Sequence, residues 1–111
     1  MIGGLTAIHQ FCRVGRHAIT GGCSKIVQDV PPFFIADGNP AEVRGVNQVG
    51  LERAGFEAET IRALKEAYRI LYRGKLNVKQ SVEAIRKEVP DLPEIAELCG
   101  FIESSERGII R

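Results

Sequence analysis

The chain has 111 residues, enough for one domain, and its net charge of +1 predicts no strong attraction to nucleic acid or to a membrane surface. Its three cysteines include no Cys-x-x-Cys pair, which argues against a disulfide framework or a zinc site. No apolar run approaches the roughly 20 residues of a membrane span and no signal peptide is recognisable, so we expect a cytoplasmic protein without membrane insertion.

The first thirty residues follow a six-residue repeat. A small side chain recurs at the fifth position of each hexad, and the leading residues are Ile2, Ile8, Val14, Thr20 and Ile26. This period suits neither an α-helix nor a two-sided strand, but it is typical of a parallel β-helix in which each hexad forms one face of a three-sided coil. Three hexads close one turn, so fewer than two turns are present, whereas a solenoid generally needs about three stacked units. We therefore expect the chain to be the C-terminal part of a longer protein.

The composition changes near residue 40. The first forty residues hold five charged side chains, and the remaining seventy-one hold twenty-four. Pro31 and Pro32 lack the amide donor that a ladder needs, so the regular β-helix should end there, and residues 33–36 should form a short strand or a cap over the last coil. We predict two units, the end of a β-helix with its cap over residues 1–40 and an α-helical domain over residues 41–111.

Beyond residue 40 the apolar period becomes helical. One helix should end at Gly74, and its apolar stripe consists of Ile61, Leu64, Tyr68, Leu71 and Tyr72. A second helix should begin after Asn77 as N-cap, with Gln80 as its capping-box partner, and a third should follow Asp91, with Glu94 in the same role. The predicted fold class is therefore mixed β and α, with terminal β-helix coils followed by a C-terminal α-helical domain.

Four segments resemble the C-terminal part of the UDP-N-acetylglucosamine O-acyltransferases of lipid A biosynthesis, a hexapeptide-repeat family. In chain order these segments are residues 2–11 (IGGLTAIHQF), 28–32 (QDVPP), 45–56 (GVNQVGLERAGF) and 107–111 (RGIIR). The resemblance covers essentially the whole chain and would correspond to roughly the last two-fifths of a family member. It implies a cytoplasmic homotrimer of left-handed parallel β-helices, each followed by a helical domain.

The resemblance also implies a reaction. Family members move a 3-hydroxyacyl chain from acyl carrier protein to the sugar 3-hydroxyl of UDP-N-acetylglucosamine, and they need no cofactor because the acyl donor is a carrier-protein thioester. Their general base is a histidine on an earlier coil, before the position that matches Met1, and neither His9 nor His17 matches it. We therefore expect no catalytic residue in this chain and no activity from the chain alone. We interpret His17 as structural.

Four residues match substrate-binding positions of the family: His9, Gln10, Asn47 and Arg53. His9 and Gln10 match a pair that faces the cleft between subunits, although His9 could instead pack at a coil corner. Arg53 matches an arginine that engages the nucleotide, where a guanidinium offers a planar fork of donors, and the alternative is an ordinary surface arginine. Asn47 matches a position near the uracil, and it suits equally well an N-cap for residues 48–54.

Acyl carrier protein is acidic as a class, so surface cations are candidates for docking it. The candidates are Arg13, Arg16, Lys25, Lys65, Arg69 and Arg73, with scattered solvated cations as the alternative. Two other functions remain open. One is a non-catalytic remnant that trimerises or binds a UDP-sugar, and the other is a sister β-helix enzyme that acylates a sugar amine, although such relatives should differ between Asn47 and Phe56.

Overall fold

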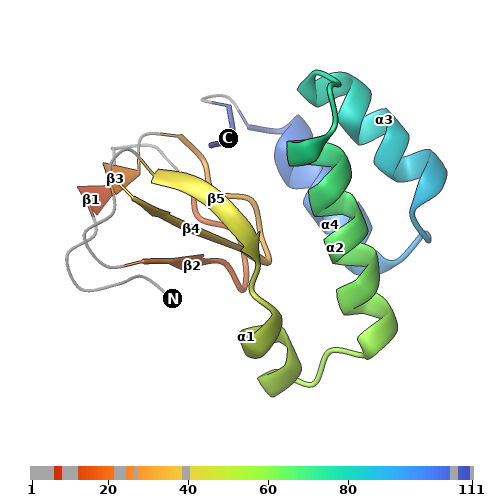
Figure 1. The fold of residues 1–111 in the computed structure, drawn as a ribbon, viewed down its shortest axis with the longest axis horizontal. Helices are drawn as coiled ribbons and strands as arrows, with labels where there is room; N and C mark the ends of the chain where they lie inside the picture. The colour runs from red at the N-terminus through yellow and green to blue at the C-terminus, as the bar shows by residue number, and fades with distance from the viewer. Residues whose placement is uncertain are drawn as a thin grey trace.

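The computed structural model describes residues 7–8, 13–21, 25–26, 28–38, 41–105 and 108–110. Short strands lie at one side of the molecule and three longer helices at the other, and a short helix leads from the strands to the helices (Figure 1). The strands are β1 (Ala7–Ile8), β2 (Ile19–Thr20), β3 (Lys25–Ile26), β4 (Phe34–Gly38) and β5 (Ala41–Val46). The helices are α1 (Gln48–Arg53), α2 (Ala58–Arg73), α3 (Val78–Glu88) and α4 (Pro93–Glu103).

The first strands pair as successive turns of a coil. β1 lies parallel to β3, with Ala7 opposite Lys25, eighteen residues later, which is the length of three hexads. A parallel bridge also joins Val14 to Val30, sixteen residues later, so the turn that ends before the prolines is two residues shorter than three hexads. Ala18 and Val30, the fifth members of their hexads, are fully buried. The pairing of β1 with β3 confirms the coil that the six-residue repeat predicts.

The parallel pairing between coil turns stops at Pro31 and Pro32 and resumes in β4. β4 lies parallel to β2, with Ile35 opposite Ile19, so the segment after the prolines covers the last coil as expected. The other edge of β4 pairs antiparallel with β5, with an irregular register between Ile35 and Ala36. The coil is therefore followed by a mixed three-stranded sheet in the order β2-β4-β5.

One face of β5 contacts the core and the other faces solvent. Ala41 and Val43 are buried, whereas Glu42 and Arg44 are exposed, which is the alternation of a half-buried antiparallel strand. The pairing of β4 with β5 spans the predicted boundary after residue 40. The division into units of residues 1–40 and 41–111 stays a prediction.

α2 connects the sheet to the other helices. Its predicted stripe is confirmed, with Ile61, Leu64 and Leu71 buried and Tyr68 and Tyr72 partly buried. The rings of Tyr68 and Tyr72 lie 5.7 and 5.9 Å from the ring of Phe34 in β4, in edge-to-face contact. Gly74 is the C-cap residue, as expected. This aromatic contact fixes α2 against the sheet.

α3 begins at the predicted capping box. The Asn77 side chain accepts a hydrogen bond from the Gln80 amide at 2.8 Å, and the Gln80 side chain accepts one from the Asn77 amide at 3.1 Å. Val82 and Ile85 then face the core. The start of this helix is therefore determined locally, by two residues three positions apart in the sequence.

The predicted cap of α4 is wrong. Leu92, not Asp91, is the N-cap residue, no side chain caps this end, and Pro93 occupies the first helical turn. A proline suits that turn because it has no amide to leave unpaired, and its ring keeps the preceding residue extended, as Leu92 is at φ −109° and ψ 152°. Pro93 therefore determines where the helix starts, and Glu94 contributes only its charge to the first turn.

Cys99 is fully buried in α4, and desolvation raises the pKa of its thiol. Within the described ranges, no group of three or more His, Cys, Asp and Glu side chains is placed to hold a metal ion. No helix among the same residues is both long enough and apolar enough to cross a membrane.

Candidate substrate-binding site

Two of the four predicted substrate-binding residues belong to the described part of the chain. His9 and Gln10 lie outside it. Asn47 immediately precedes α1, and Arg53 is the last residue of that helix. α1 has only six residues, and helices this short are not stable alone in water, so its orientation depends on contacts at its ends.

Asn47 is buried at the start of α1, with 6 % of its surface exposed. Its side-chain Oδ1 accepts a hydrogen bond from the Gly50 amide at 3.2 Å, and its Nδ2 donates to the carbonyl of His17 at 2.9 Å. Its backbone amide donates to the carbonyl of Phe33 at 2.8 Å. The N-cap interpretation is therefore confirmed, and contact of Asn47 with a uracil stays a prediction.

Arg53 is exposed at the end of α1. Among the described residues, its guanidinium makes no hydrogen bond or ion pair. Val49 lies one turn earlier on the same face and is 61 % exposed, whereas Leu51 on the opposite face is fully buried. The free face of α1, which carries Val49 and Arg53, therefore presents an apolar side chain beside a cation that has no partner among the described residues.

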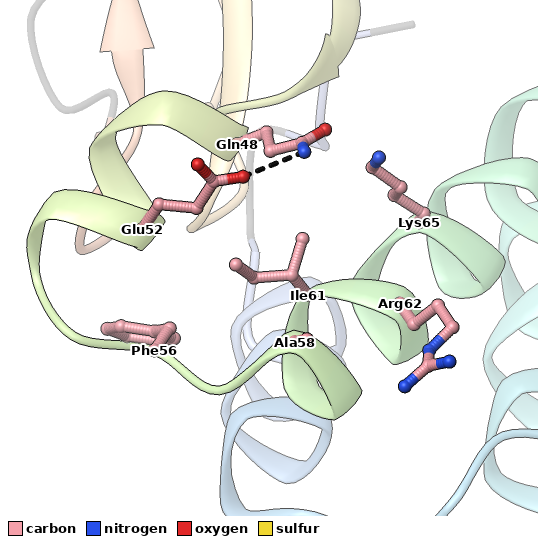
Figure 2. Close-up of a pocket in the computed structure, with 7 residues that line it drawn as sticks. All are labelled: Gln48, Glu52, Phe56, Ala58, Ile61, Arg62 and Lys65. Atoms are coloured by element: carbon pink, nitrogen blue, oxygen red, sulfur yellow. Dashed lines mark hydrogen bonds between the residues drawn. The ribbon is translucent and has the colours of Figure 1, made fainter.

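A groove of about 340 Å³ lies between α1 and the start of α2 (Figure 2). On the α1 side, Gln48 donates a hydrogen bond to Glu52 at 2.8 Å, and on the α2 side Arg62 and Lys65 extend from the helix. Ile61 lies between these two sides. Neither Asn47 nor Arg53 lines this groove, so it is separate from the free face of α1.

A second groove, of about 320 Å³, lies between β5 and α2. Lys65, Arg69 and Arg73 line it from successive turns of α2, and Gly45, Val46 and Tyr68 complete its lining. Glu66 pairs with Arg69 at 2.9 Å and so offsets part of this charge. The groove therefore presents a row of cations, spaced about one helical turn apart, beside the uncharged residues Gly45 and Val46 of β5.

The other candidate docking cations are not grouped in this way. Arg13 donates to the carbonyl of Phe101 at 3.2 Å, and its Nε lies 3.5 Å from the Asp29 carboxylate. Arg16 forms a double hydrogen bond with Glu97, which raises the pKa of Arg16. The guanidinium groups of both arginines therefore already contact carbonyl or carboxylate groups of this chain. The side chain of Lys25 lies outside the described part of the structure.

The end of the coil and the helical domain together match one known protein family. Residues 29–110 match the family described as UDP-N-acetylglucosamine O-acyltransferase, domain 2. The chain belongs to this family. The family predicted from the four sequence segments is therefore confirmed.

Curated members of the UDP-N-acetylglucosamine O-acyltransferase family match along the whole chain. The acyl-(acyl-carrier-protein)–UDP-N-acetylglucosamine O-acyltransferase of Burkholderia orbicola is 47 % identical over 116 residues, covering 100 % of this chain and 44 % of the relative. The enzyme of the same name from Myxococcus xanthus is 44 % identical over 111 residues, covering 100 % of this chain and 43 % of the relative. The chain therefore spans less than half the length of these relatives.

Solved structures of the same family share the fold. LpxA from Acinetobacter baumannii superposes with a TM-score of 0.94 at 40 % identity, covering 99 % of this chain and 43 % of that one. The UDP-N-acetylglucosamine O-acyltransferase of Moraxella catarrhalis gives a TM-score of 0.92 at 41 % identity, with 99 % and 43 % covered. The predicted fold class, the end of a β-helix followed by a C-terminal helical domain, is confirmed.

Proposed function

We propose that the full-length protein carrying this chain transfers a 3-hydroxyacyl group from acyl carrier protein to the 3-hydroxyl of UDP-N-acetylglucosamine, the first step of lipid A biosynthesis. Membership of the family supports the reaction class, and the names of the relatives supply the carrier and the acceptor. The match to an O-acyltransferase family favours a hydroxyl acceptor over the sugar amine of a sister enzyme. We also propose a cytoplasmic homotrimer that neither enters the membrane nor binds nucleic acid.

The proposed chemistry requires a general base. An alcohol attacks a thioester poorly until its proton is removed in the transition state, and hydrogen-bond donors must then stabilise the oxyanion. We do not assign the base to His17, because its imidazole packs 5.1 Å from the Phe56 ring and 6.3 Å from the Phe33 ring. We assign the base to a histidine on an earlier coil of the full-length protein. In this proposal residues 1–111 bind substrates and have no catalytic activity alone.

The observation that carries nucleotide binding is the guanidinium of Arg53, which is exposed at the end of α1 and makes no hydrogen bond or ion pair with the other described residues. A guanidinium binds phosphate oxygens through two parallel hydrogen bonds, which suits the diphosphate of a UDP-sugar. Val49 offers an apolar surface one turn away, next to which a nucleoside can pack. Arg53 is therefore the residue in the described part of the chain that we assign to the nucleotide.

Replacing Arg53 tests this assignment in the full-length protein. Charge-assisted hydrogen bonds contribute about 1.5–3 kcal/mol, so Arg53→Ala should raise the KM for UDP-N-acetylglucosamine about 10- to 100-fold. The KM for the acyl carrier protein should not change. Arg53→Lys, which keeps the charge but not the planar fork, should give an intermediate KM. Arg62→Ala removes another exposed arginine and serves as the control; an unchanged KM for Arg53→Ala would remove the assignment.

We propose the groove between β5 and α2 as the docking site for acyl carrier protein. Lys65, Arg69 and Arg73 supply positive charge along one line, and an acidic partner would complement it. Arg69 pairs with Glu66, as Arg13 and Arg16 pair with acidic groups of this chain, but Lys65 and Arg73 form no ion pair among the described residues. The groove and the free face of α1 would then hold the donor and the acceptor on separate surfaces.

A further inference from the structure

Four residues form what we call the corner cluster: His17, Phe33, Asn47 and Phe56. The His17 ring lies 6.3 Å from the Phe33 ring, nearly parallel to it, and 5.1 Å from the Phe56 ring, edge to face. The Phe33 and Phe56 rings are 6.0 Å apart. Asn47 joins the cluster through its hydrogen bonds to the carbonyls of His17 and Phe33. The cluster thus links two corners of the coil to both ends of α1.

The two coil corners of this cluster have a strained backbone. His17 has φ 58° and Phe33 has φ 72°, and these are the only residues other than glycine with positive φ in the described part of the chain. Such a conformation is energetically unfavourable for a bulky residue other than glycine. Both carbonyls accept a hydrogen bond from the same asparagine, one from its side chain and one from its backbone. The surrounding contacts therefore maintain a geometry that neither residue favours alone.

The chain that leaves α1 returns to the same cluster. Gly55 has φ 87°, a conformation that glycine adopts without strain, and the amide of Phe56 donates to the carbonyl of Leu51 at 3.0 Å. This turn places the Phe56 ring against His17 and Phe33. α1 is therefore attached at its start by Asn47 and after its end by Phe56, and Arg53 lies between these two attachments.

α4 supports the cluster from the other side. The guanidinium carbon of Arg16 lies 5.5 Å from the centre of the Phe33 ring and 5.9 Å from that of Phe56. The same guanidinium makes hydrogen bonds of 2.8 to 3.2 Å to the Glu97 carboxylate. Coil, α1 and α4 therefore meet at one point, so the orientation of the short helix α1 is coupled to the rest of the fold.

We infer that the corner cluster is a positioning device for Arg53, and that Asn47 acts on the nucleotide through Arg53 rather than by its own contact. This inference rests on the proposed function, in which Arg53 binds the diphosphate. Both side-chain polar atoms of Asn47 already have partners within the chain, whereas Arg53 makes no hydrogen bond or ion pair among the described residues. The role of His17 is to present its carbonyl and its ring to α1.

Asn47→Asp in the full-length protein tests the inference. Aspartate caps a helix about as well as asparagine, so the bond from Gly50 is kept, but a carboxylate oxygen would face the His17 carbonyl and repel it. We expect the KM for UDP-N-acetylglucosamine to rise about five- to tenfold, the KM for acyl carrier protein to stay unchanged, and kcat to change little. Asn77→Asp makes the same change at the N-cap of α3 and should leave both KM values unchanged.

A double variant with Arg53→Ala separates the possible outcomes. If Asn47 acts through Arg53, adding Asn47→Asp to Arg53→Ala will raise the KM for UDP-N-acetylglucosamine little further. If the two rises in KM multiply instead, Asn47 makes a separate contact and the inference is overturned. If Arg53→Ala raises the KM but Asn47→Asp does not, the inference fails and the proposed function stands. If Arg53→Ala has no effect, both fail.

A second variant covers the case in which Asn47→Asp does not fold. Phe56→Leu loosens the other attachment of α1 without changing Asn47, and it should raise the same KM in the same direction. A thermal midpoint close to that of the unaltered protein, together with an unchanged KM for UDP-N-acetylglucosamine, would count against the positioning role.

Discussion

The carboxylate of Asp29 accepts a hydrogen bond of 2.6 Å from the hydroxyl of Ser105, across 76 residues of sequence. Asp29 is 2 % exposed, and its other oxygen accepts a hydrogen bond of 2.7 Å from the amide of Arg13. Its backbone donates to the carbonyl of Gly108 and accepts from the amide of Ile110. Asp29 therefore attaches the end of the chain to the coil that precedes the prolines.

Removing this carboxylate should destabilise the fold. Asp29→Ala leaves the Arg13 amide and the Ser105 hydroxyl without their partner, which should lower the free energy of unfolding by about 2–4 kcal/mol. Urea denaturation followed by circular dichroism measures the loss. Asp37→Ala removes a carboxylate whose pair with Arg44 is about half exposed, and it should move the midpoint much less. Equal shifts for the two variants would contradict this account of Asp29.

Two helical glycines should respond to alanine in opposite directions. A Cβ at Gly50 would collide with the amide group of Asn47, so Gly50→Ala should lower the thermal midpoint by breaking the cap of α1. A Cβ at Gly100 in α4 would meet no atom within 4 Å, so Gly100→Ala should stabilise the protein by about 0.5–1 kcal/mol. Differential scanning calorimetry compares the two. Stabilisation by both would show that the Asn47 cap is dispensable.

The cation row of α2 should control association with the carrier protein. Charge reversal of its three residues, Lys65, Arg69 and Arg73, should raise the KM for acyl carrier protein about tenfold or more at low salt, with a smaller difference at high salt. The KM for UDP-N-acetylglucosamine should not change. The control reverses the same number of charges at other exposed lysines, namely Lys75, Lys79 and Lys87. A similar rise in the control would indicate net charge rather than a docking site.

The contact between α3 and α4 should weaken in acid. Arg86 forms two hydrogen bonds with Glu103, at 2.6 and 2.7 Å, and these lower the pKa of Glu103 below its ordinary value of 4.5. A lowered pKa means that the pair stabilises the fold above the unfolded-state pKa, and that this contribution is lost as the pH falls through the folded-state pKa.

Titration of the Glu103 carboxyl carbon by NMR should therefore give a pKa below 4.5 in the unaltered protein and a higher one in Arg86→Gln. An identical pKa in both proteins would contradict the pairing. Both side chains are about half exposed, so raising the salt concentration should reduce the difference.

Local patterns in the sequence determined most of the secondary structure. The hexads predicted parallel pairing eighteen residues apart, and the capping box at Asn77 predicted the start of α3, because each depends on residues a few positions apart. The prediction failed at α4, where Asp91 and Glu94 have the right spacing for a cap but Pro93 determines the start. In that case one local rule competed with another, and sequence alone did not rank them.

The arrangement of the candidate site was decided by the tertiary structure. The sequence identified Asn47 and Arg53 but left Asn47 with two roles, and only the positions of the His17 and Phe33 carbonyls show that its side chain is already engaged. Likewise, six cations were candidates for docking, and only packing places Lys65, Arg69 and Arg73 along one groove. Spacing along the chain determines which residues share a turn or a face, whereas contacts between residues far apart in sequence depend on how coil, sheet and helices pack together.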